Sequence, residues 1–193
     1  MRRSLPVLFG LVSTMMAWSL RADILSAGSS SVTVGATFVV PVAIAGTSDL
    51  YAFQFDATYD PTILQLLSIN EGPFLATAGN TFFIPGTIDN VSGDATFTAD
   101  TLLGPGPGAA GSGTLATLDF QAIASGTSAL SLANVILLDS NLNNLAFTTS
   151  DGSITVSAPV TGTVPEPNSI TLLAGVLGCL AVVRFRKYKR RAH

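Results

Sequence analysis

The sequence predicts a single all-β domain, an antiparallel β-sandwich of about nine strands, between residues 23 and 157. Short runs of alternating apolar and polar residues, rich in Val, Thr and Phe, are separated by clusters of Gly, Pro, Asn and Asp. This pattern is typical of a sandwich. Because the chain has only one cysteine, Cys179, no intrachain disulfide can form, and the domain must depend on its hydrophobic core.

Two alternating stretches, 32–34 and 38–44, open the domain. Pro41 lies within the second stretch and has no N–H to donate, which predicts an edge strand or a bulge. Residues 46–49, Gly-Thr-Ser-Asp, predict a turn before the next strand.

The clearest alternation in the chain spans residues 51–59. Its apolar face, which we expect in the central core, consists of Tyr51, Phe53, Phe55, Ala57 and Tyr59. The opposite face carries Gln54, Asp56 and Thr58, which are candidates for a partner-binding face; a plain solvated surface is the alternative.

The remaining strands are shorter and are separated by turn residues. A Gly- and Pro-rich segment, 104–113, has few side chains with which to pack and predicts a mobile surface loop. The expected strands are 63–69, 82–84, 95–99, 115–123, 129–132, 135–138, 145–147 and 154–156.

Charge is distributed unevenly along the chain. All nine Lys and Arg residues lie near the two ends, and the one histidine is His193. Residues 23–183 therefore contain no cationic side chain, whereas all twelve Asp and Glu residues lie between Asp23 and Glu166. Such an anionic domain repels nucleic acid, so we expect no nucleic-acid partner.

The missing cations also exclude most classes of enzyme. Without His there is no Ser-His-Asp arrangement, and without Lys or Arg there is no Schiff base or cationic oxyanion clamp. Carboxylate chemistry remains, but Glu71 is the only Glu in the predicted domain. We expect no catalytic residues, and a small carboxylate-only surface hydrolase stays as an alternative.

Calcium is the one candidate cofactor. Asp89, Asn90 and Asp94 bracket a turn that contains Gly93, and they offer the oxygen ligands that calcium prefers. The alternative is that these residues simply form the turn.

The N-terminus has the pattern of a secretory signal peptide, residues 1–22. Arg2 and Arg3 precede an apolar stretch, 5–20. Cleavage is expected after Ala22, with Ala17 as an alternative site.

The C-terminus predicts a linker, 158–168, a transmembrane helix, 169–183, and a cytoplasmic tail, 184–193. Its fourteen-residue apolar run reaches roughly 21 Å, against roughly 30 Å of bilayer hydrocarbon, which suits a temporary membrane anchor. Cations stay on the cytoplasmic side, so the domain before the helix faces outward. They form a basic stop of Arg184, Arg186, Lys187, Lys189, Arg190 and Arg191.

Val164, Pro165, Glu166 and Pro167, followed by a short apolar helix and a basic cluster, resemble the PEP-CTERM sorting signal of Gram-negative, exopolysaccharide-producing bacteria. The resemblance implies that a membrane exosortase cuts near this motif and releases the domain to the cell surface or the extracellular matrix. An ordinary single-pass anchor is the alternative.

Four segments in order, 34–42, 49–55, 59–61 and 113–120, together resemble a cohesin domain. The resemblance covers most of residues 23–157 and implies a nine-stranded jelly-roll sandwich that binds a dockerin-like protein or a carbohydrate. The chain departs from typical cohesins in lacking cations and in carrying a lone domain. We therefore expect an exported, non-enzymatic adhesion module in a polysaccharide matrix, with a structural matrix filler as the alternative.

Overall fold

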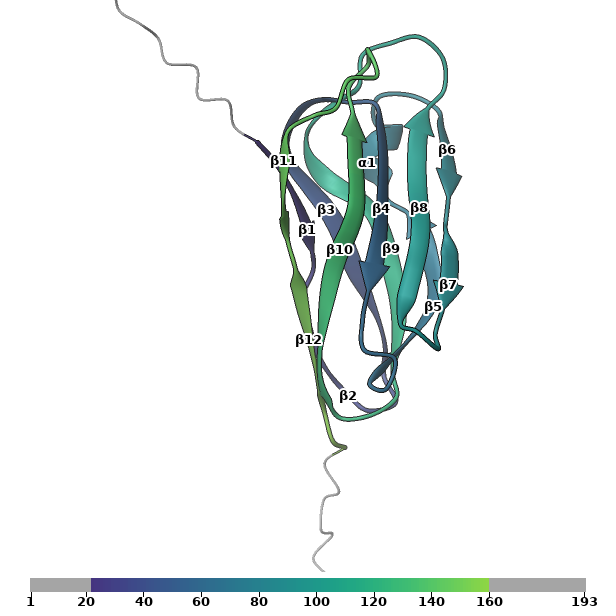
Figure 1. Cartoon of the computed structure of the whole chain (residues 1–193), viewed down its shortest axis with the longest axis vertical. Coiled ribbons are helices and arrows are strands. Elements are labelled where there is room, and N and C mark those ends of the chain that lie inside the picture. Colours follow the sequence, from purple (N-terminus) through teal and green to yellow (C-terminus); the bar gives the residue numbers. More distant parts are fainter. Residues whose placement is uncertain (1–21, 160–193) are drawn as a thin grey trace, which may run out of the picture. The chain divides into compact units, whose positions relative to one another are not determined.

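The computed structural model describes residues 22–159 and shows a sandwich of two β-sheets (Figure 1). The predicted all-β class is confirmed, although these residues form twelve strands rather than nine, together with the one-turn helix α1 (Pro73–Ala76). The strands are β1 (Asp23–Ala27), β2 (Ser30–Thr33), β3 (Thr37–Leu50), β4 (Ala52–Thr58), β5 (Leu64–Glu71), β6 (Thr81–Ile84), β7 (Thr87–Asp89), β8 (Asp94–Leu102), β9 (Ala109–Ala122), β10 (Gly126–Leu138), β11 (Phe147–Ser150) and β12 (Gly152–Ser157).

One sheet has the strand order β11-β1-β3-β9-β5, and the other has the order β2-β12-β10-β4-β8-β6, with β7 beside β8. The sheets are not wholly antiparallel as predicted, because β1 pairs with β11 and β2 pairs with β12 in parallel. The first two strands lie in different sheets, and so do the last two. The chain crosses between the sheets near Gly28. Gly152 packs closely against this crossing, because a Cβ added to Gly152 would come within 2.1 Å of the Gly28 carbonyl oxygen.

The core lies between the sheets and follows the predicted alternation. Phe53, Phe55 and Ala57 of β4 and Tyr59 just after it are buried, and the polar residues between them point outward. Tyr51, predicted in the same core face, is only partly buried, and its hydroxyl donates to the Gly104 carbonyl. Phe120 of β9 is fully buried; its ring stacks on Phe38 with a centroid distance of 5.9 Å and meets Tyr59 edge-on at 5.2 Å. Aromatic side chains from both sheets thus meet at the centre of the sandwich.

The predicted turn at 46–49 is wrong, because β3 continues through it to Leu50. Gly46 has a φ of +85°, and the register between β3 and β9 shifts on either side of Thr47. The irregularity is therefore a bulge inside a long strand, where glycine relieves the strain of a positive φ.

Pro41 was predicted to mark an edge strand or a bulge. β3 is instead a central strand between β1 and β9, so the edge interpretation is wrong. The Pro41 carbonyl accepts from Gly28 N–H, where the chain leaves β1, and the β3–β9 register shifts one residue later, between Val42 and Ala43. The N–H that Pro41 lacks would therefore point to the end of the hydrogen-bond ladder between β1 and β3.

The Gly- and Pro-rich segment is shorter as a loop than predicted, because β9 begins at Ala109. The Asp49 carboxylate holds this loop by accepting from Gly108 N–H at 2.5 Å, and it also accepts from the Ser140 hydroxyl at 2.7 Å. The Ser140 hydroxyl lowers the pKa of Asp49, and the two backbone donors, Gly108 and Ser140, add to the effect.

Residues 22–159 contain no helix that is long and apolar enough to cross a membrane. The predicted signal peptide, sorting motif, transmembrane helix and basic tail involve residues 1–21 and 160–193, which lie outside the described residues. These features stay predictions.

Replacing Phe120 with Ala should lower the free energy of unfolding by about 3–5 kcal/mol, because it leaves a cavity where the two sheets meet. Phe82→Ala is the matched control: Phe82 is 59% exposed, so its removal should change stability by less than about 0.5 kcal/mol. Urea unfolding of the full chain measures both, and equal losses would contradict this account of the core.

Candidate functional site

The candidate site is the outer face of four adjacent strands, β10, β4, β8 and β6. Gln54, Asp56 and Thr58 lie on this face, as the alternation along β4 predicts. The three do not form one cluster, because β4 spreads them along its length. Each has a different environment, and apolar side chains from the neighbouring strands lie beside them.

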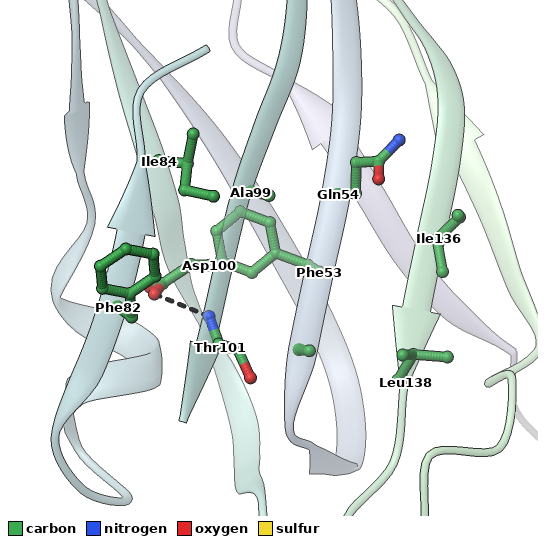
Figure 2. A pocket seen from close by; sticks show the side chains of 10 residues that line it. Phe53, Gln54, Phe82, Ile84, Ala99, Asp100, Thr101, Ile136 and Leu138 are labelled. Atoms are coloured by element: carbon green, nitrogen blue, oxygen red, sulfur yellow. Dashed lines mark hydrogen bonds between the residues drawn. The ribbon is translucent and has the colours of Figure 1, made fainter. Parts of the chain in front are cut away.

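An open depression with a volume of about 250 Å³ occupies one end of this face (Figure 2). Phe82 on β6 and Ile136 on β10 stand at opposite sides of it and are 59% and 42% exposed. Gln54 is the one polar amide in its wall. We call it the apolar pocket; it is lined by Ala52, Phe53, Gln54, Phe82, Ile84, Ala99, Asp100, Thr101, Ile136 and Leu138.

Asp56 lies beyond the pocket and binds both neighbouring strands. One carboxylate oxygen accepts from Phe97 N–H of β8 at 2.7 Å, and the other accepts from the Asn134 amide of β10 at 2.6 Å. Both partners have a positive φ, 61° for Phe97 and 48° for Asn134, and the strand registers shift beside each of them. Asp56 therefore holds two bulges that flank β4.

The bulge on β8 also determines the position of an aromatic side chain. A left-handed backbone costs about 1–2 kcal/mol for an ordinary L-residue such as Phe. At Phe97 this conformation accompanies a side chain that is 51% exposed. The face thus combines an apolar pocket, a second exposed aromatic ring and a carboxylate whose two oxygens are already bonded.

Thr58 is exposed at the other end of β4, between Asp94 of β8 and Ser131 of β10. Sequence reasoning identified this polar row but missed Phe82, Phe97 and Ile136. Residues 82–84, 95–99 and 135–138 were expected as strands, but 82–84 is the unbroken apolar run Phe-Phe-Ile, in which no alternation indicates that Phe82 faces outward. No sequence signal marks the bulge that exposes Phe97.

The proposed calcium ligands lie in the β7–β8 turn. Asp89 accepts from Val91 N–H, Ser92 N–H and the Ser92 hydroxyl, and these donors lower its pKa, with Val91 contributing most. These contacts are those of a turn-forming Asp.

Asn90 points from the same turn to the other sheet. Its Oδ1 accepts from the Tyr59 hydroxyl at 2.7 Å and from Leu66 N–H at 2.8 Å, and its Nδ2 donates to the Leu66 carbonyl at 3.0 Å. The amide thus pairs with the edge of β5 as a neighbouring strand would. Across residues 22–159, no three His, Cys, Asp or Glu side chains come together as a metal site, and calcium at Asp89, Asn90 and Asp94 stays a prediction.

Comparison with known proteins identifies one family. A model described as the cohesin domain matches residues 25–156, about two thirds of the chain. No curated protein matches the chain.

Several solved structures are similar to the chain. A non-cellulosomal cohesin from Archaeoglobus fulgidus is 17% identical with a TM-score of 0.58, covering 71% of this chain and 92% of its own. The sixth cohesin of Acetivibrio cellulolyticus scaffoldin B, solved in complex with a dockerin, is 20% identical with a TM-score of 0.59, covering 71% and 100%. CaCohA2 from Clostridium acetobutylicum is 25% identical with a TM-score of 0.54, covering 75% and 94%.

Asp56→Ala should lower the free energy of unfolding by about 1–3 kcal/mol, because it removes the acceptor of both bulges. Amide exchange at Phe97 should accelerate at the same time. Asp151→Ala is the matched control, since this exposed carboxylate accepts only from the Ser131 hydroxyl, at 2.9 Å, and should cost less than about 0.5 kcal/mol. Unchanged exchange at Phe97 in the Asp56 variant would refute the bulge-holding role.

Proposed function

The chain belongs to the cohesin family, and from that premise we propose that its sandwich docks a dockerin-like protein partner on the outer face of β10, β4, β8 and β6. Cohesins are non-catalytic modules, so family membership bears out the expectation that the chain is not an enzyme. The remaining question is which surface binds, and what it binds.

Similarity to solved complexes supports a protein partner. Some of the solved structures that are similar to this chain are cohesins in complex with dockerins, and these include cohesins from Acetivibrio cellulolyticus. At 20% identity this likeness shows the fold alone. The choice of partner and surface for this chain is therefore our proposal.

We propose this face as the docking surface because it contains the apolar pocket. Phe82, Phe97 and Ile136 expose apolar side chains on one face, next to the polar groups of Gln54 and Asp56. A buried apolar centre with a polar rim is the arrangement that gives protein interfaces most of their affinity.

Electrostatics restrict the partner further. The domain has no Lys, Arg or His, so every charged side chain on this face is a carboxylate, Asp56 and Asp94 included. A partner that brings Lys or Arg to the rim gains complementary charge and a faster association, whereas an acidic partner is repelled.

Two other roles compete with this proposal. A polysaccharide can stack on exposed aromatic rings, and Phe82 and Phe97 provide two on the same face. A structural matrix filler needs no specific face. Binding measurements with surface variants separate all three roles.

Ile136→Asp should weaken binding of a dockerin domain by at least about tenfold, because it places a charge in the apolar pocket. The probe is a panel of dockerin domains from the source organism, measured by calorimetry against the full chain. Val39→Asp is the matched control: Val39 is 58% exposed but lies on the other sheet, and this change should leave affinity unaltered.

The outcomes of this experiment are distinct. Loss of affinity in the Val39 variant alone would move the site to the other sheet. Binding of neutral glycans but of no dockerin would favour the polysaccharide role, and binding of neither would favour the filler.

We further propose that an exosortase processes the chain at Val164-Pro165-Glu166-Pro167 and that the domain then resides on the cell surface or in the extracellular matrix of a Gram-negative bacterium. The order of proline motif, apolar run and basic cluster supports this proposal. Before processing, the apolar run holds the chain in the membrane.

Protein recovered from the cell exterior should lack the basic stop, Arg184 to Arg191, when its intact mass is measured. Replacing Pro165, Glu166 and Pro167 together with Ala should keep the chain uncut and in the membrane fraction. Recovery of exterior protein that still carries the basic stop would overturn the sorting proposal and favour a permanent anchor.

A further inference from the structure

A pair of carboxyl groups, Glu71 and Asp100, lies apart from the proposed turn site, and Asp100 also borders the apolar pocket. Glu71 is the last residue of β5 in one sheet, and Asp100 lies on β8 in the other. The Thr81 hydroxyl of β6 donates to Glu71 Oε1 at 2.5 Å, and Phe83, two residues further along β6, pairs with Asp100. Glu71, Thr81 and Asp100 therefore come from three strands in the region where β5, the edge of one sheet, approaches β6, the edge of the other.

Asp100 is the buried member of the pair, with 2% of its surface exposed. Its Oδ1 accepts from Thr101 N–H at 2.8 Å, as Figure 2 shows, and its carboxyl lies beside β6 close to Phe82. Its Oδ2 is buried and has no protein donor. A buried carboxylate oxygen without a protein partner is costly, and a water, a proton or a cation would relieve that cost.

Nothing in the protein neutralises this pair. The Asp100 carboxyl is within hydrogen-bond reach of Glu71, and burial, followed by the Glu71 charge, raises the pKa of Asp100 to about 6. β6 contributes no ionisable group, and the β4 residue paired with Asp100 is Phe53. Because residues 22–159 contain no Lys, Arg or His, only a proton or an external cation can relieve the repulsion.

We propose that Glu71 and Asp100, together with the Thr81 hydroxyl, bind a divalent cation of the calcium class where the two sheet edges meet. Two carboxylates and a hydroxyl provide up to five oxygen ligands, and water completes the six to eight that calcium accepts. Magnesium requires near-octahedral geometry and gives up its water reluctantly, so it fits this irregular set less well.

The cation replaces the proton that the pair otherwise shares. In its absence, the raised pKa of Asp100 means that the folded state holds a proton more tightly than the unfolded state does. Stability should then fall as the pH rises from 3.8 through about 6. Calcium should restore that stability above about pH 6 and have little effect near pH 4, where protons occupy the pair.

The test is thermal unfolding of the full chain in mild detergent at about pH 7.5, with and without calcium. A site with only two carboxylates is expected to bind in the range of extracellular modules, about 0.1–1 mM. Calcium at about ten times the dissociation constant should raise the Tm by about 3–5 °C. Magnesium at the same concentration and ionic strength should raise it less.

Three variants locate the site. Glu71→Gln removes the exposed carboxylate and Asp100→Asn removes the buried one, and each should abolish the calcium shift; the Gln variant keeps the test valid if the Asn variant folds poorly. Asp89→Asn is the matched control at the β7–β8 turn and should keep the full shift. The proposal is overturned by no calcium shift in the parent chain, by an unchanged shift in Glu71→Gln, or by loss of the shift in Asp89→Asn alone.

Discussion

The absence of any cationic side chain from the described domain is the constraint on which its structure depends. Carboxylates here cannot form ion pairs, so they bind backbone N–H groups and hydroxyls instead. Asp60 accepts from Thr62 N–H and the Thr62 hydroxyl, and Asp139 accepts from the N–H groups of Asn141 and Asn143. The acidic residues thus stabilise turns and bulges through local hydrogen bonds, and the sandwich is stabilised chiefly by its apolar core.

This use of carboxylates changes how the polar side chains of Gln54, Asp56 and Thr58 on β4 are interpreted. From the sequence, Asp56 was a candidate for direct contact with a partner, yet both of its oxygens hold neighbouring strands. In the proposed docking, Asp56 would therefore act indirectly, through the bulge that exposes Phe97. Only Gln54 of the three candidates lies in the wall of the apolar pocket.

Periodic segments were predicted well because burial on one face dictates alternation, as in β4 and in the Leu118–Ala122 part of β9. β1 was missed because its five residues directly follow the expected signal peptide, and β7 because it has only three. Gly46 is compatible with a turn and with a bulge. The structure has a bulge, because β3 pairs with β9 on both sides of Gly46. The meeting of Glu71 with Asp100 depends on how two sheets stack, and no local pattern encodes it.

The strand registers also determine how far the apolar pocket stands from the point where the chain leaves the domain. β12 runs beside β10 (Figure 1) and ends next to its start, where Val156 pairs with Gly126. The pocket includes Leu138, at the far end of β10. Thirteen residues of strand at about 3.3 Å each separate the two, a span of roughly 40 Å. The apolar pocket and the end of β12 therefore lie at opposite ends of the same sheet, so a partner bound in the pocket stays far from the end of β12.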